Sequence, residues 1–175
     1  MMLKKYSNKL VALHWMTVPL MILSLGMGTF VLAEMPNNLE KINSLQVHMI
    51  IGFVVGLLTL IRIFVKKNHQ ALEPLKVEND ARKKLIKFTH FALYTLILLM
   101  VASGITLSIM SGLGEIVFFG SSAPLPEDFS IYLPRKAHGI FAKVLFAFIG
   151  IHIVGVLLYK FKTDSSISKR MWFGK

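Results

Sequence analysis

Residues 137–159 read AHGIFAKVLFAFIGIHIVGVLLY, an apolar run of 23 residues that contains two histidines and one lysine. At about 1.5 Å per residue, a helix of this length crosses the roughly 30 Å of hydrocarbon in a bilayer. A helix satisfies its own backbone hydrogen bonds in lipid, so this run is predicted to span a membrane. Ionisable side chains are costly at that depth, which makes His138 and His152 candidates for a functional role.

Three further apolar runs have the same character and carry no charge. They cover residues 10–33, 42–61 and 88–114, and each is long enough to span a bilayer. The apolar share of 54% is too large for the interior of a soluble domain of this size. The predicted fold class is therefore all-α, a transmembrane four-helix bundle, and 175 residues make residues 1–175 a single membrane domain.

The net charge of +11 is spread over the ends of the apolar runs. This placement is typical of membrane topology and argues against a nucleic-acid partner. Sixteen lysines and arginines fall in the two tails and the second connection, against three in the first and third connections, with Lys143 set aside. The positive-inside rule therefore predicts a multi-pass protein with both termini in the cytoplasm.

The chain contains no cysteine. This excludes disulfides, cysteine-ligated zinc, iron–sulfur clusters and haem attached through a C-x-x-C-H motif. A metal cofactor must therefore be held without a covalent tether, by histidine, methionine or oxygen ligands.

Four of the six histidines fall at two depths of the predicted bundle. His14 and His152 lie toward the cytoplasmic ends of the first and fourth spans, and His48 and His138 toward the periplasmic ends of the second and fourth. His138 and His152 share a helix face to within roughly 40° and are about 21 Å apart along it. The sequence thus predicts two flat macrocycles, held by His14 with His152 and by His48 with His138. A metal cluster does not fit, because its ligands must converge on one point.

A haem also requires close backbone approach and cations for its propionates. Small residues permit the approach, and the candidates are Gly26, Gly28, Gly52, Gly56, Gly104, Gly139, Gly150 and Gly155. Arg62, Lys136 and Lys143 are placed to meet propionates, although snorkelling to the interface explains Arg62 equally well. His69, in a polar run that ends at Gln70, is interpreted as a solvated loop residue.

These features resemble the bacterial cytochrome b561 family of four-helix dihaem membrane proteins over essentially the whole chain. The matching stretches are Tyr6-Ser7, Leu13-His14-Trp15, Val47-His48-Met49-Ile50-Ile51-Gly52, Leu60-Ile61-Arg62, His90 with Leu93-Tyr94, Ala102-Ser103-Gly104, Lys136-Ala137-His138, Ile149-Gly150-Ile151-His152 and Lys169-Arg170-Met171-Trp172. In that family the inner haem is held from helices one and four, and the outer from helices two and four. The resemblance implies two non-covalent bis-histidine haems b in a bacterial inner membrane, with the same histidine pairs.

The short stand-alone members that this chain resembles act as superoxide oxidases. The resemblance implies that superoxide is oxidised at the periplasmic face, that electrons pass through both haems to ubiquinone, and that no protein partner is obligatory. Positive potential would steer superoxide to the outer haem, and the candidate residues are Lys41, Arg135, Lys136 and Lys143. Quinone reduction needs a proton donor near one haem, and the candidate is His90.

Two alternatives concern the electron source and the class of protein. A cytochrome b subunit that links a periplasmic hydrogenase or dehydrogenase to the quinone pool would use the same haem arrangement. The short periplasmic connections and the count of four spans favour the stand-alone enzyme. A haem-free proton or ion transporter would carry carboxylates at the membrane midplane, whereas no Asp or Glu lies inside the predicted spans.

Overall fold

The computed structural model describes residues 5–69, 79–163 and 167–173, which form helices and loops without a strand. The long helices are α1 (Asn8–Gly26, continued by the π-helical η1, Met27–Val31), α2 (Leu39–Lys67), α3 (Asp80–Ser111) and α5 (Leu133–Thr163). The short ones are α4 (Leu113–Phe118), η2 (Phe129–Ile131) and η3 (Ile167–Met171). Within these ranges four helices are long and apolar enough to cross a membrane, which confirms the predicted all-α bundle.

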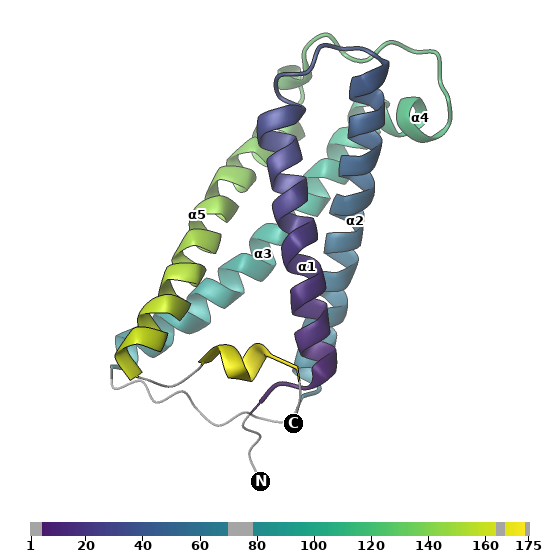
Figure 1. The fold of residues 1–175 in the computed structure, drawn as a ribbon. Coiled ribbons are helices and arrows are strands. Elements are labelled where there is room, and N and C mark those ends of the chain that lie inside the picture. Colours follow the sequence, from purple (N-terminus) through teal and green to yellow (C-terminus); the bar gives the residue numbers. More distant parts are fainter. Residues whose placement is uncertain (1–4, 70–78, 164–166, 174–175) are drawn as a thin grey trace.

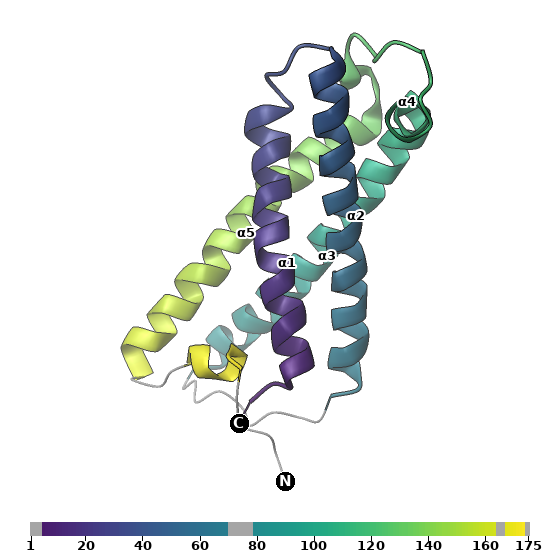
Figure 2. The ribbon, with the colours of Figure 1, turned by 45° about the vertical axis from the view of Figure 1, so that its right-hand side comes forward.

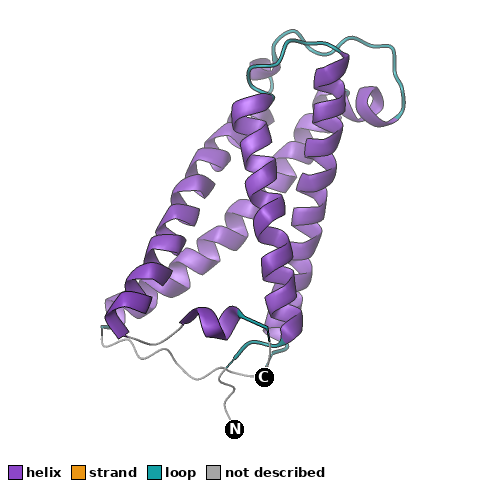
Figure 3. Cartoon of the chain, viewed as in Figure 1, coloured by secondary structure: helices purple, strands orange, loops and turns teal. Residues whose placement is uncertain are grey.

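The helices are connected at the two ends of the bundle (Figure 3). The start of α1 and the helix η3 lie at one end, here called the inner end, and α4 lies at the opposite, outer end (Figure 1). The predicted cytoplasmic charge includes Lys4, Lys76 and Lys175, which lie outside the described residues, as does Gln70.

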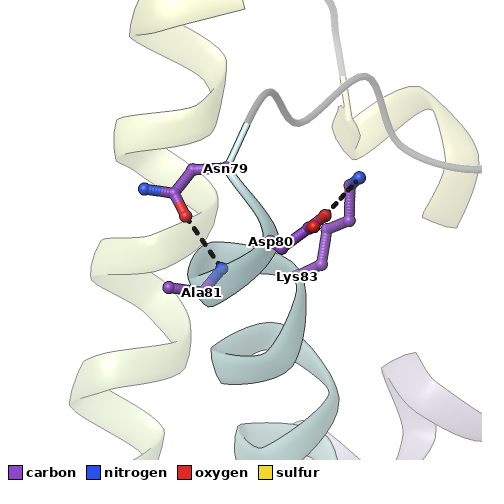
Figure 4. A network of polar contacts seen from close by, with 4 residues as sticks. All are labelled: Asn79, Asp80, Ala81 and Lys83. Carbon is purple, nitrogen blue, oxygen red and sulfur yellow. Dashed lines mark hydrogen bonds and ion pairs between the residues drawn. The ribbon is translucent and has the colours of Figure 1, made fainter.

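Helix α3 begins at Asp80, eight residues before the start of the apolar run at residue 88. Its first turn is capped, because the Asn79 side chain accepts a hydrogen bond from the Ala81 backbone N–H at 2.8 Å. Figure 4 shows this cap beside the 2.9 Å ion pair of Asp80 and Lys83. Capping satisfies an otherwise unpaired N–H, so the helix extends through a charged turn that hydropathy alone does not assign to it.

The predicted outer boundary of the third span, residue 114, is wrong. Helix α3 ends at Ser111, and Gly112 takes a left-handed conformation with φ of 70° that glycine adopts without steric cost. Helix α4 follows immediately and packs over the outer end of α2. Its buried cluster consists of Leu113, Ile116, Val117 and Leu125.

The helices pack as two pairs, α1 on α2 and α3 on α5, and α2 also contacts α3 (Figures 1 and 2). The main core comprises Leu25, Val55, Leu96, Ile97 and Leu145. Leu145 lies on α5 seven residues from both His138 and His152. This apolar layer therefore separates the two histidine levels.

Gly56→Ala is expected to destabilise the contact between α2 and α3. A Cβ at Gly56 would lie 2.9 Å from Cγ2 of Val101, and overpacking of this kind costs about 1–3 kcal/mol. The measurement is the Tm in detergent. Gly155→Ala is the matched control, because its Cβ would meet nothing within 4 Å, and Val101→Ala should rescue Gly56→Ala. An unchanged Tm for Gly56→Ala would contradict the close contact.

Candidate functional site

A cavity of about 1140 Å³ lies in the outer half of the bundle. Typical ligand pockets enclose about 300–1,000 Å³, so this cavity can hold a group of macrocycle size. Gly52 lines it, and a Cβ at that position would meet nothing within 4 Å, so the backbone of α2 is open to the cavity there. The predicted histidine ligands and basic residues in its wall are His48, His138, Lys41, Arg135, Lys136 and Lys143.

The imidazoles of His48 on α2 and His138 on α5 lie close together in this cavity. Their ring centroids are 6.2 Å apart and their planes are inclined by 72°. An imidazole nitrogen binds a first-row metal at about 2 Å, so two imidazoles on opposite sides of one iron have centroids roughly 6 Å apart. The outer pair therefore fits the axial ligation of a haem iron.

Each of these imidazoles is held through Nδ1 by a serine hydroxyl. Ser24 Oγ lies 3.3 Å from Nδ1 of His48, and Ser103 Oγ lies 2.9 Å from Nδ1 of His138. The single hydroxyl proton of Ser103 is donated to the Met100 carbonyl at 2.9 Å. The Ser103 oxygen therefore accepts from the Nδ1–H of His138, which leaves Nε2 with a free lone pair. A metal-binding histidine needs this tautomer.

Two glycines make room for these imidazoles. A Cβ on Gly28 would lie 3.1 Å from Cε1 of His48, and one on Gly104 would lie 3.4 Å from Cε1 of His138. These contacts give Gly28 and Gly104 a role beside the histidine rings, whereas the sequence suggested glycine only for backbone approach to a macrocycle.

The mouth of the outer cavity carries charges of both signs. The Lys41 ammonium donates to the Met35 carbonyl at 2.9 Å and lies 5.8 Å from the ring centroid of Phe129. Asp128 also lines the cavity. Hydrogen bonds from the side chain and backbone of Ser130 hold the pKa of Asp128 below its usual range. Asp128 is therefore ionised near neutral pH and opposes the positive potential of the four basic residues.

At the inner level, histidines from three helices gather. The ring of His152 on α5 lies 5.1 Å from that of His90 on α3, centroid to centroid. His90 donates through Nδ1 to the Ile86 carbonyl at 2.7 Å, and His14 is close enough to interact electrostatically with both other histidines. The described residues show no ring contact between His14 and His152, so an opposed pair is seen at the outer level and not at the inner one.

Arg62 connects His14 to an aromatic and cationic cluster. Its NH1 donates to Nδ1 of His14 at 2.8 Å, and its guanidinium lies 5.7 Å from the Tyr94 ring centroid. Lys66 Nζ is 5.3 Å from the same centroid. The cluster therefore brings imidazoles, which are able to ligate iron, together with cations, which are able to pair with propionates. Guanidinium only donates, so Nδ1 of His14 accepts, and iron binding at its Nε2 requires this hydrogen bond to be given up.

The sequence assigned no site role to Ser24, Ser103, Lys66 and Tyr94, although Ser103 and Tyr94 fall in stretches that carry the family resemblance. The two serines could have been identified from the sequence, because a hydroxyl inside an apolar span usually forms a hydrogen bond to a neighbouring helix. Among the residues that the structure describes, no group of three His, Asp or Glu side chains is arranged to hold a metal ion by itself.

Comparison with curated proteins gives no match. A family model described as prokaryotic cytochrome b561 matches residues 5–174, which is nearly the whole chain. The four membrane-length helices agree with that family's fold. The chain therefore belongs to the prokaryotic cytochrome b561 family, and it is an integral membrane protein that binds b-type haem and transfers electrons.

Proposed function

We propose that the protein oxidises superoxide at the outer face of a bacterial inner membrane and passes the electrons through two haems b to ubiquinone. The supporting observation is the outer cavity, in which His48 and His138 lie 6.2 Å apart beside four basic residues. In this proposal His48 and His138 hold the outer haem, and His14 and His152 hold the inner one. Both chain termini then lie in the cytoplasm.

The outer step requires an anion to approach the outer haem. Each superoxide gives up one electron and leaves as O₂, so no proton is needed at this end. Lys41, Arg135, Lys136 and Lys143 line the cavity that contains the histidine pair. These four cations outnumber the two carboxylates in the lining, Glu127 and Asp128. The resulting excess of positive charge in a cleft with apolar walls would concentrate an anionic substrate, which supports superoxide as the electron donor.

In this proposal the protein side chains determine where the two haems, which carry the electrons, are held. Each haem, when bound, supplies a one-electron carrier whose potential depends on its ligands and surroundings. Ser103 keeps Nε2 of His138 available for iron, and Ser24 holds the ring of His48. The buried apolar layer around Leu145 lies between the two levels.

The inner step requires protons as well as electrons. One ubiquinone takes up two electrons, supplied by two superoxides, and two protons to become ubiquinol. His90 is the proposed proton donor, because a titratable imidazole lies beside His152 in a cluster with Arg62 and Tyr94. Protons would then enter from the inner end, the level at which His90 lies.

The test is superoxide-driven ubiquinone reduction by the purified chain in liposomes. We expect the haems to be reduced rapidly by superoxide and two superoxides to be consumed for each ubiquinol formed. Haems that are indifferent to superoxide but are reduced by a periplasmic hydrogenase or dehydrogenase would reject this function in favour of a cytochrome subunit.

Removing two cavity cations should slow the reaction with superoxide. For Lys136→Gln combined with Lys143→Gln, we expect about a tenfold lower second-order rate at low salt, because steering raises on-rates by about 10–10³. Stopped-flow haem reduction at several ionic strengths measures the effect. Asp128→Asn should raise the rate, and Lys84→Gln, on the exposed inner end of α3, should leave it unchanged. Equal rates in all variants would contradict steering.

A further inference from the structure

Residues 167–173, here called the C-terminal strap, cross the inner end of the bundle. The strap contains η3 and contacts α5. Figures 1 and 2 both show it, in yellow, between the inner ends of α5 and α1. Those two helices pack mainly on other partners, α1 on α2 and α5 on α3. The strap therefore connects the two helices that carry His14 and His152.

Three contacts fasten the strap to the start of α1. The indole N–H of Trp15 donates to the Met171 carbonyl at 2.7 Å. The Trp15 and Trp172 rings meet edge to face, with centroids 5.8 Å apart and an interplanar angle of 78°. The Tyr6 backbone N–H donates to the Arg170 carbonyl at 3.2 Å. Hydrogen bonds and ring packing therefore both attach residues 170–172 of the strap to the N-terminal part of α1.

The segment just before α1, Tyr6 and Ser7, also contacts the loop that follows α2. The Ser7 backbone N–H donates to Nε2 of His69 at 3.1 Å, and the Tyr6 and His69 rings are 6.0 Å apart. His69 lies in a loop, as expected, but it is half-buried and accepts a hydrogen bond, so it is not a freely solvated residue. These contacts hold the N-terminal side of α1 from two directions.

The contacts of Trp15 continue to a proposed haem ligand. The imidazole of His14 packs against Trp15, with centroids 5.3 Å apart and an interplanar angle of 65°. Nδ1 of the same imidazole accepts from Arg62 at 2.8 Å. Iron binding at Nε2 of His14 would release the Arg62 bond, whereas the contact of the imidazole with Trp15 does not depend on that bond. Trp15 is in turn held by the strap.

An interfacial aromatic belt explains part of this arrangement, because tryptophan favours the level of the lipid headgroups. Such a belt requires no particular partner for the indole N–H. The bond to Met171 and the edge-to-face contact with Trp172 give Trp15 a defined orientation within the protein. Orientation of a ligand by its neighbours tunes the metal that it binds.

We propose that the C-terminal strap positions the inner haem ligand His14 through Trp15 and sets its relation to His152 on α5. Trp15 and Trp172 are positioning residues, and neither is a ligand. The inference rests on the proposed function, because it requires His14 to hold the inner haem.

The test compares the two haem signals of the full-length holoprotein after strap substitutions. For Trp172→Ala we expect a shift in the low-spin electron paramagnetic resonance signal and in the midpoint potential of the inner haem, with those of the outer haem unchanged. Trp15→Phe should shift the same signals less, because it keeps the ring and loses the N–H donor. Trp172→Phe should show the wild-type signal and potential, since phenylalanine keeps an edge-to-face partner for Trp15.

Docking of the strap can be followed independently of the haems. The chain has two tryptophans, and they contact each other. In Trp172→Ala the remaining Trp15 should therefore show red-shifted emission relative to Trp172→Phe. Phe173→Ala is the control, because Phe173 is exposed and makes no ring contact in the described part of the chain.

His14→Ala separates failure of the strap inference from failure of the proposed function. If this variant keeps both haems, the proposed ligand assignment fails. If it loses one haem, but Trp172→Ala and Trp15→Phe leave both signals unchanged, the strap inference is overturned and the ligand assignment stands. Equal shifts of both haems would also overturn it, because they would indicate general loosening. Trp15→Phe decides the question should Trp172→Ala fail to fold.

Discussion

His138→Ala is expected to remove one of two haems and to abolish superoxide-driven quinone reduction. The substitution deletes one member of a pair whose ring centroids are 6.2 Å apart and leaves the inner cluster about 21 Å away along α5. Haem content per polypeptide and the reduced-minus-oxidised spectrum measure the loss. The fold should persist, because the apolar core lies between the two levels.

The pairing itself is tested by His48→Ala, which should remove the same haem as His138→Ala. The double variant should lose no more haem than either single variant, since in the proposed pairing both histidines hold one iron. Loss of different haems from the two single variants would contradict the outer pair, as would retention of both haems in a folded protein.

Ser103→Ala is expected to weaken retention of the outer haem by about 10–100-fold, the usual effect of removing a partner that orients a metal ligand. The hydroxyl accepts the Nδ1 proton of His138 and thereby fixes both the tautomer and the ring orientation. Transfer of haem to an excess of a haem-accepting protein provides the measurement.

Two matched variants on the same helix make this experiment specific. Ser103→Thr keeps the hydroxyl and should retain haem nearly as well as the wild type. Thr106→Ala removes a hydroxyl that bonds only to the Ala102 carbonyl in the described residues, at 2.9 Å, and it should change nothing. Equal haem retention by Ser103→Ala and Thr106→Ala would show that the serine has no role in holding His138.

The bundle could be predicted from sequence because hydrocarbon imposes a simple constraint. Runs of twenty or more apolar residues must form helices there, and all four expected spans occur. The depth of each histidine follows from its position along a straight helix, so the proximity of His48 and His138 was predictable. The turn at Gly112 was not predicted. Its left-handed conformation ends α3 before the apolar run ends.

The neighbours of each imidazole depend on helix rotation and pairing, which depth does not determine. Because α3 packs along α5, His90 is the ring beside His152. Hydrogen bonds from Arg62 to His14 and from His138 to Ser103 likewise depend on helix faces that no local pattern specifies. The contact between Trp15 and the strap joins residues 156 positions apart, beyond the reach of periodicity.

The most direct test of the central claim is the haem count of the purified chain, measured with its reduced-minus-oxidised spectrum and followed by superoxide addition in the presence of ubiquinone. We expect two low-spin b haems per polypeptide, both reduced rapidly by superoxide and reoxidised by ubiquinone. A chain with a single haem, or with two haems that superoxide does not reduce, would contradict the central claim.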